Sequence, residues 1–279
     1  MLKKSASVVL AALRGSTYRI VRLASSLAAA FLNGLFEHPA WYLLLVPDVR
    51  TSNILTCHNS FPQFAKMAYT PKVKICGITN AEDATVAVAA GADALGFVFY
   101  RKSPRYIEPT LARQIILSLP PLVIPVGVFV NEDQQVVRNL MDDCGLALAQ
   151  LHGNESAIYC KELGRTVLKA LRVKDRSTFL ALAEFRGRAG VRGFVLDAFS
   201  DQAYGGTGEV IDWQLAAEAA KAASILLAGG LTPDNVGEAI QAVQPYGVDV
   251  SSGVEGSPGK KNHDKVRAFI QAVRVVSLT

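Results

Sequence analysis

The sequence predicts a single (β/α)8 barrel, an α/β fold, formed after an N-terminal extension in a chain of 279 residues. Two observations support this prediction. Apolar segments rich in Val, Ile, Leu and Phe alternate eight times with segments of helical periodicity after Lys72, and they are nearly continuous, as in parallel strands buried on both faces. Such alternation gives right-handed parallel units, and eight of them close into a barrel. A doubly wound open sheet is the alternative.

Eight strands and eight helices are expected in alternation. The strands fall near residues 72–76, 93–99, 122–130, 147–151, 166–172, 192–197, 224–228 and 246–251. The helices fall near residues 81–90, 109–118, 132–144, 155–163, 176–185, 212–223, 233–243 and 264–275. Asn80, Asn131 and Thr232 suit the starts of helices. Gly91, Gly145 and Gly164 suit their ends.

The net charge of +5 belongs to the N-terminal part of the chain. Residues 1–66 hold seven Lys/Arg and two Asp/Glu, whereas the remainder holds 22 of each. The body is neutral and shows no basic stripe with interleaved aromatic residues, so no nucleic-acid surface is expected. The four cysteines form no C-x-x-C pair and no metal-ligand spacing with the histidines. Reduced thiols and no metal are expected.

Residues 1–66 differ from the rest of the chain in composition and pattern. They are poor in acidic residues, rich in Ala, Ser and Leu, and show no regular hydrophobic periodicity. The explanations are an upstream start codon with the natural start at Met67, a transit peptide, or a membrane anchor. The apolar run from Leu23 to Phe36 is short of the roughly 18–20 residues that span a membrane. We expect the mis-set start, then the transit peptide. A barrel domain over residues 67–279 would then lie in the cytoplasm, or in a plastid or other organelle if the transit peptide is genuine.

Two residues at the ends of predicted strands suggest acid–base chemistry. In a parallel barrel, side chains at the carboxyl ends of the strands point into one mouth, where active sites lie. Cys76 ends the first strand, and a thiol can act as a base where its surroundings stabilise the thiolate. Asp197 ends the sixth, and a carboxyl kept protonated by burial can donate a proton. The structural alternatives are an inert buried cysteine and a loop-capping carboxylate.

Three more polar residues are expected at the same mouth. Arg105 follows the second strand and either clamps a substrate carboxylate or is a solvated side chain. His152 follows the fourth strand and either donates to the substrate or bonds within its loop. Asp249 projects from an otherwise apolar strand and needs a partner, for which a sugar hydroxyl or a helix N-terminus would serve.

Glycine-rich loops follow the last three predicted strands. Converging backbone N–H groups bind phosphate, and glycine lets the backbone approach closely; barrels often place that site after strands 7 and 8. A lone glycine pair is often only a tight turn, but three loops at one end favour a phosphorylated small molecule. The expected phosphate contacts are Gly206, Gly208, Gly229, Gly230, Ser251, Ser252 and Gly253.

Taken in order, these motifs closely resemble the phosphoribosylanthranilate isomerase family. The resemblance spans Val73 to about Val275. It is carried by KICGIT at 74–79, GADALGF at 91–97, SPR at 103–105, VGVF at 126–129, QLHG at 150–153, GGTG at 205–208, GGL at 229–231 and DVSSGVE at 249–255. Each motif alone is weak, but the ordered set is specific.

The resemblance implies a barrel enzyme, an aldose–ketose isomerase that works without a cofactor. Its reaction would be the Amadori rearrangement of N-(5-phosphoribosyl)anthranilate to 1-(2-carboxyphenylamino)-1-deoxyribulose 5-phosphate, the third step of tryptophan biosynthesis from chorismate. It further implies that Cys76 is the general base and Asp197 the general acid. Arg105 and His152 would then lie near the anthranilate moiety, Asp249 at the ribose hydroxyls, and the glycine loops at the phosphate.

Three rival functions are weighed against this one. The sister barrel of the histidine pathway uses aspartate where this chain has Cys76, and shows a twofold repeat that is absent here. Indoleglycerol-phosphate synthase needs a catalytic lysine framework that is not found. A non-catalytic phosphate-binding barrel has no need of both Cys76 and Asp197. The sequence favours neither a monomer nor a homodimer.

Overall fold

The structure is a computed structural model that describes residues 70–187, 190–198 and 211–276. The expected N-terminal extension lies outside the described residues, and so do Gly206 and Gly208. Within the described residues, no helix is both long enough and apolar enough to cross a membrane.

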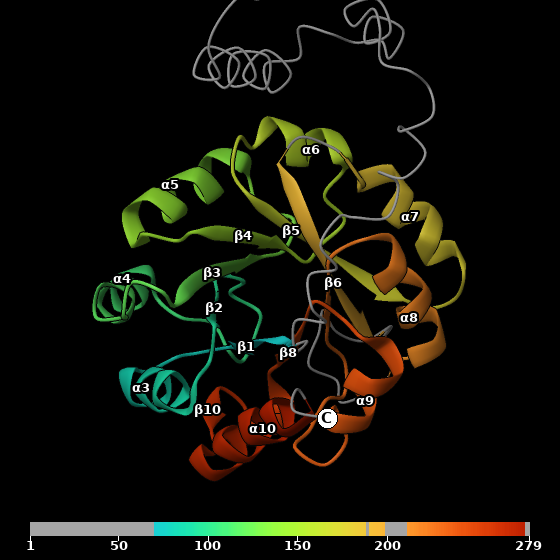
Figure 1. Cartoon of the computed structure of the whole chain (residues 1–279). Helices are drawn as coiled ribbons and strands as arrows, with labels where there is room; N and C mark the ends of the chain where they lie inside the picture. The colour runs from blue at the N-terminus through green and yellow to red at the C-terminus, as the bar shows by residue number, and fades with distance from the viewer. Residues whose placement is uncertain (1–69, 188–189, 199–210, 277–279) are drawn as a thin grey trace, which may run out of the picture. The chain divides into compact units, whose positions relative to one another are not determined.

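Eight parallel strands form a closed barrel in which each strand pairs with the next in the chain (Figure 1). The ring closes where β1 pairs with β8, with Lys74 directly opposite Asp249. This confirms the predicted barrel, and the doubly wound sheet is wrong. The strands are β1 (Lys72–Cys76), β2 (Ala94–Val98), β3 (Ile124–Phe129), β4 (Leu148–Leu151), β5 (Val167–Val173), β6 (Val191–Ala198), β7 (Ile225–Leu227) and β8 (Gly247–Val250).

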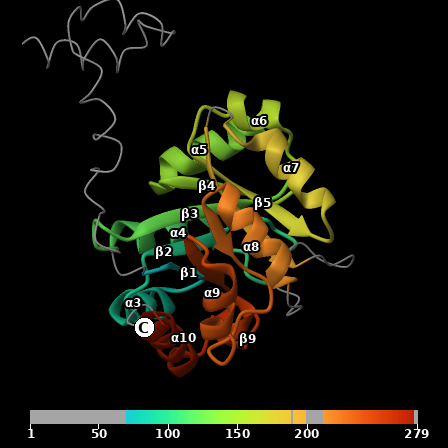
Figure 2. The same cartoon turned by 45° about the vertical axis from the view of Figure 1, so that its right-hand side comes forward.

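Helices surround the barrel and follow the strands one by one (Figure 2). They are α3 (Ala81–Ala90), α4 (Pro109–Leu117), α5 (Gln134–Cys144), α6 (Ala157–Glu162), α7 (Ser177–Phe185), α8 (Trp213–Ala222), α9 (Val236–Val243) and α10 (His263–Val276). The connection from β8 to α10 also contains a 3-10 turn, η4 (Ser252–Val254), and an antiparallel pair, β9 (Glu255–Ser257) and β10 (Lys260–Lys261). The sequence pattern did not predict these three short elements.

Two of the predicted helix starts are wrong. The Asn80 side chain caps α3 as expected, by accepting a hydrogen bond from the Asp83 N–H. Asn131 does not cap α5, because its backbone is left-handed with φ of 51°; Asp133 is the cap. Thr232 does not start α9, which begins four residues later at Val236.

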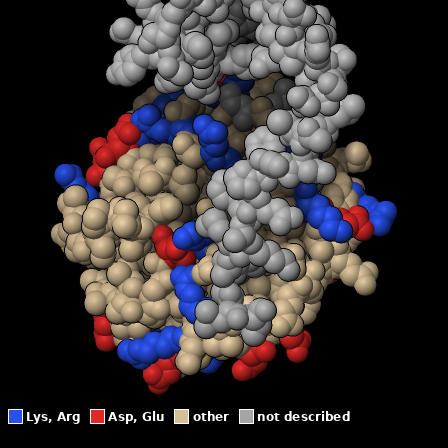
Figure 3. Space-filling view, viewed as in Figure 1, with Lys and Arg blue, Asp and Glu red and all other residues tan. Residues whose placement is uncertain are grey.

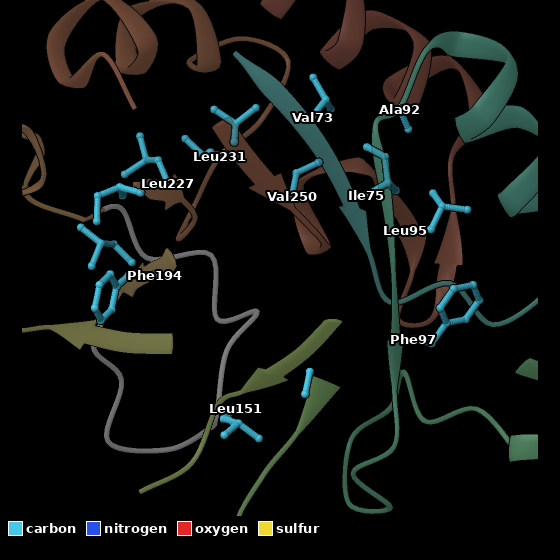
Figure 4. Close-up of a cluster of buried hydrophobic side chains, with 14 of the residues drawn as sticks. Val73, Ile75, Ala92, Leu95, Phe97, Leu151, Phe194, Leu227, Leu231 and Val250 are labelled. Atoms are coloured by element: carbon cyan, nitrogen blue, oxygen red, sulfur yellow. The ribbon is translucent and has the colours of Figure 1, made fainter. Parts of the chain in front are cut away.

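The alternation of side chains along each strand divides the core into two layers. One face packs against the helices; Figure 4 shows part of this layer, including Val73, Ile75 and Leu95. The other face fills the barrel interior, because successive side chains of a strand point to opposite faces. The apolar side chains of the interior form two clusters. One consists of Val126, Leu168, Ala170, Val195, Leu226 and Ala228, and the other of Cys76, Val98 and Val128. Lys74 and Cys76 share the second face, since each is one position removed from Ile75.

The surface charges of the described residues are mixed. On the face seen in Figure 3, basic and acidic side chains lie near one another on the part of the surface that is described. This agrees with the equal numbers of basic and acidic residues after residue 66.

Candidate active site

One pocket at the carboxyl ends of the barrel strands collects every predicted site residue that the structure describes. The predicted residues that line it are Cys76, Arg105, His152, Asp197, Gly229, Gly230, Asp249, Ser251, Ser252 and Gly253. They come from six different strands and the loops that follow them. The prediction that these distant segments meet at one mouth is therefore confirmed, whereas their chemical roles stay predictions.

Cys76 is the last residue of β1 and is 9% exposed. Burial raises the pKa of its thiol, because the charged thiolate loses water contact. The ammonium groups of Lys74 and Lys261 act in the opposite direction, and the Asp249 carboxylate adds to the rise. Burial outweighs the cations, so the thiol form dominates at neutral pH in the unliganded protein.

Asp197 and His152 face each other across the pocket. His152 Nε2 lies 3.3 Å from Asp197 Oδ2, but the geometry is not that of a hydrogen bond, and Nε2 has no other partner within the described residues. The other ring nitrogen, Nδ1, lies 3.2 Å from Nε2 of Gln150. The second carboxylate oxygen, Asp197 Oδ1, accepts a hydrogen bond from the Ala198 N–H at 2.9 Å.

Asp249 has a partner that the sequence did not suggest. Its Oδ2 accepts a hydrogen bond at 2.8 Å from the ammonium of Lys74, which is itself buried. The sequence suggested a sugar hydroxyl or a helix N-terminus as the partner and did not point to this buried ammonium. Asp249 Oδ1 is buried and has no partner within the described residues. That oxygen stays available to a ligand.

The Arg105 guanidinium is fixed by hydrogen bonds to the buried carboxylate of Glu255. Its Nε and Nη2 each donate to Glu255 at 2.8 Å, and Lys261 Nζ lies 3.0 Å from the same carboxylate. Burial alone would raise the pKa of Glu255, but the two cations lower it, so the group is ionised at neutral pH. Arg105 is thus a fixed, pocket-lining cation and not the solvated side chain of the alternative reading.

The glycine loops after β7 and β8 lie directly against each other. Gly229 and Gly230 have left-handed backbones, with φ of 77° and 66°. A Cβ atom on Gly253 would overlap the backbone carbonyl oxygen of Leu231. Only a residue without a side chain permits this approach, which brings the two loops together at one end of the pocket.

Replacing Gly253 by alanine should lower the free energy of unfolding by about 1–3 kcal/mol, because backbone must move to relieve the overlap. Gly256→Ala is the matched control: its new Cβ would meet nothing nearer than Asn262 Cβ at 3.9 Å, and its expected change is under about 0.5 kcal/mol. Urea unfolding of both variants measures the difference. Equal stabilities would contradict the close packing of the two loops.

Three buried polar atoms in the pocket wall lack partners within the described part of the chain. They are Gln150 Oε1, His152 Nε2 and Asp249 Oδ1. Buried polar groups are normally hydrogen-bonded, so three such atoms on residues that line one pocket indicate a polar ligand. Among residues 70–187, 190–198 and 211–276, no group of three or more His, Cys, Asp or Glu side chains is placed to hold a metal ion.

Sequence reasoning missed four residues around the site: Lys74, Gln150, Glu255 and Lys261. Two of them carried a usable signal, because Lys74 precedes Cys76 by two positions and Gln150 precedes His152 by two, which places each pair on one strand face. Glu255 and Lys261 lie in the connection whose short elements were not predicted. Local sequence gave no sign that Glu255 binds both Arg105 and Lys261.

A closed (β/α)8 barrel with a polar pocket at the carboxyl ends of its strands defines a class, the barrel enzymes that act on small molecules. The family model described as "PRAI: N-(5'phosphoribosyl)anthranilate (PRA) isomerase" matches residues 73–272. The N-(5'-phosphoribosyl)anthranilate isomerase of Trichlorobacter lovleyi is 54% identical over 201 residues, which are 72% of this chain and 96% of that protein.

Solved structures give the same result. The phosphoribosyl anthranilate isomerase of Thermotoga maritima is 41% identical with a TM-score of 0.69, over 74% of this chain and 99% of that one. A phosphoribosyl anthranilate isomerase in complex with reduced 1-(o-carboxyphenylamino)-1-deoxyribulose 5-phosphate is 41% identical with a TM-score of 0.66, with the same coverage. The chain belongs to the N-(5'-phosphoribosyl)anthranilate isomerase family. It is an isomerase of tryptophan biosynthesis.

Proposed function

We propose that Cys76 and Asp197 are the general base and the general acid of the isomerisation. The observation that supports this assignment is that both side chains line one pocket. Three other residues of its wall each carry a buried polar atom that has no partner in the described part of the chain. One group must protonate the sugar ring and another must remove a carbon-bound proton. A carboxyl and a thiol on different strands provide the two functions without competing for one position.

The first step is ring opening. Asp197 gives its proton to the furanose ring oxygen of the substrate, the bond from that oxygen to C1 breaks, and the nitrogen lone pair forms the C1=N bond of an iminium ion. His152, 3.3 Å from Asp197 through its Nε2, is the neighbour best placed to orient the carboxyl and the substrate. Asp197 is left as a carboxylate.

The second step is proton removal from C2. The Cys76 thiolate takes that proton, the C–H electrons form the C1=C2 bond, and the iminium nitrogen becomes neutral. The positive iminium acidifies the C2 proton, so the step uses only groups of the chain and the substrate. The resulting enolamine then tautomerises to the ketone by losing the hydroxyl proton at C2 and gaining a proton at C1.

The remaining pocket residues bind the substrate in this scheme. Arg105, with Nε and Nη2 fixed by Glu255, attracts the anthranilate carboxylate through its third nitrogen. His152 lies beside the anthranilate moiety. The free oxygen of Asp249 accepts from the ribose hydroxyls.

Phosphate binding falls to the backbone of the loops after β7 and β8. Gly229, Gly230, Ser251, Ser252 and Gly253 line one part of the pocket, and the overlap test at Gly253 indicates that the loops converge. Converging N–H groups suit phosphate oxygens. Gly206 and Gly208 stay predicted phosphate contacts on the sequence pattern alone.

We further propose that residues 67–279 are the complete isomerase domain and that residues 1–66 contribute nothing to the reaction. The family match over residues 73–272 supports this division. The Trichlorobacter lovleyi relative supports it too, because 72% of this chain covers 96% of that protein.

Turnover is tested by the loss of substrate fluorescence, with N-(5-phosphoribosyl)anthranilate generated in place. The full chain and a shortened chain beginning at Met67 should convert it at the same rate. A folded full chain without turnover would contradict the activity. An active full chain beside a folded but inactive shortened chain would contradict only the division at residue 67.

A further inference from the structure

Lys74 is a charged residue in a place where barrels normally place apolar side chains. It is 1% exposed and lies in the middle of β1. Its nearest charged partner is Asp249, directly opposite on β8, with 2.8 Å between Nζ and Oδ2. Asp249 is only 6% exposed. Both charges of the pair are therefore removed from water.

A buried ion pair of this kind is poor evidence for stability. Removing two charges from water costs several kcal/mol per ion before their attraction is counted, and apolar residues of similar volume often do as well or better. The rest of the barrel interior shows that apolar filling was available, because Val126, Leu168, Val195 and Leu226 fill the neighbouring layer. The pair therefore calls for an explanation other than packing.

The position of Lys74 relative to Cys76 provides that explanation. The two residues are two apart on one strand, so both side chains enter the interior. They meet above Gly96 on β2: a Cβ atom there would lie 2.7 Å from Cys76 Sγ and 3.1 Å from Lys74 Nζ. The absence of a side chain at Gly96 leaves the space in which the ammonium and the sulfur interact.

The ammonium is also oriented from the other side. Asp249 Oδ2 accepts a hydrogen bond from Lys74 Nζ. Asp249 also lines the pocket, and its Oδ1 has no partner among residues 70–187, 190–198 and 211–276. The charged groups that act on the sulfur are thus Lys74 from β1, Asp249 from β8 and, more weakly, Lys261 from β10. Of the two cations, Lys74 has the larger influence on the thiol.

We propose that Lys74 is a positioning residue for the isomerisation: its buried ammonium, held in place by Asp249, stabilises the thiolate of Cys76. This inference rests on the proposed role of Cys76 as the base. Lys74 keeps its proton throughout, and the proton removed from the substrate goes to the sulfur. Asp249 then has two functions, because one oxygen anchors the ammonium and the other faces the substrate.

The test titrates the Cys76 thiol directly, in the full chain with Cys57→Ser, Cys144→Ala and Cys160→Ala so that Cys76 is the only cysteine. Thiolate absorbance at 240 nm is followed against pH. Lys74→Met should raise the midpoint by about one pH unit or more, a tenfold loss of thiolate at neutral pH. The value of kcat should fall by a similar factor, with KM changed less than about twofold.

Asp249→Asn is the opposite control, because it removes the carboxylate and leaves the ammonium. Its midpoint should fall. Since Lys74→Met alone leaves a buried, unpaired carboxylate and can fail to fold, the double variant Lys74→Met/Asp249→Asn is compared with Asp249→Asn. That comparison isolates the ammonium, and the midpoint of the double variant should be the higher.

A purely structural role would lower stability and leave the titration midpoints equal, and this result would overturn the proposal. A different result would show that the assignment of Cys76 as the base is wrong. If Cys76 is not the base, Cys76→Ala keeps its turnover, whatever the titration of the thiol in the Lys74 variants shows.

Discussion

Replacing Asp197 by asparagine should lower kcat by about 10²–10⁴-fold, the range that general acid catalysis contributes. The amide keeps the shape of the side chain but has no acidic proton to give to the ring oxygen, so ring opening becomes the slow step. The loss of substrate fluorescence measures the effect.

Two controls make this result specific. Asp264→Asn is the same chemical change on a carboxylate that is 95% exposed at the start of α10, and it should leave kcat unchanged. The Asp197→Asn protein should still bind the reduced product analogue that a related isomerase binds, as measured by calorimetry. More than a tenth of the parent activity in Asp197→Asn would rule out this residue as the acid.

Replacing Cys76 by alanine should lower kcat by about 10²–10⁴-fold as well. The substrate still binds and its ring still opens, but no base lies near the C2 proton. The same fluorescence assay applies, with single-turnover conditions to separate chemistry from product release.

Cys160→Ala is the matched control for Cys76→Ala. Cys160 is a buried, free cysteine in α6, outside the pocket. Burial also raises the pKa of its thiol, to about 11, so it has no thiolate at neutral pH. Its loss should leave kcat unchanged even if stability falls. Equal activity of the two alanine variants would show that Cys76 is not needed for the reaction.

The fold was predictable from the sequence because each strand and helix carries its own periodicity. The apolar runs, the helical segments and glycines such as Gly91 and Gly145 are local signals, and a barrel adds only the closure of β1 on β8. The two predicted helix starts that were wrong lie where other hydrogen bonds compete, a long-range one at Asn131 and two local ones at Asn235. The Asn131 side chain accepts a hydrogen bond from the Asn154 N–H, so Asp133 caps the helix in its place. The Asn235 side chain accepts a hydrogen bond from the Thr232 N–H and donates one to the Gly230 carbonyl, and α9 begins only after Asn235.

Only those site residues that lie at or near the ends of strands could be predicted from the sequence. Cys76 and Asp197 stand out because a parallel barrel gathers such residues at one mouth. The partner of Asp249 could not be found this way, because the register of β8 against β1 joins residues 175 positions apart. The clamp of Glu255 on Arg105 spans 150 positions. Local sequence carries no information about either contact.

The pH dependence of kcat/KM tests most directly the claim that a buried thiol is the base. This parameter reports the protonation of the free enzyme, and burial raises the pKa of the Cys76 thiol above its ordinary value. The base must be deprotonated and the acid protonated, so kcat/KM falls on the alkaline side only above the higher of their two pKa values. That fall should therefore begin above the ordinary pKa of a thiol, and it should be about tenfold per pH unit. An alkaline fall that begins near neutral pH would contradict the assignment of Cys76.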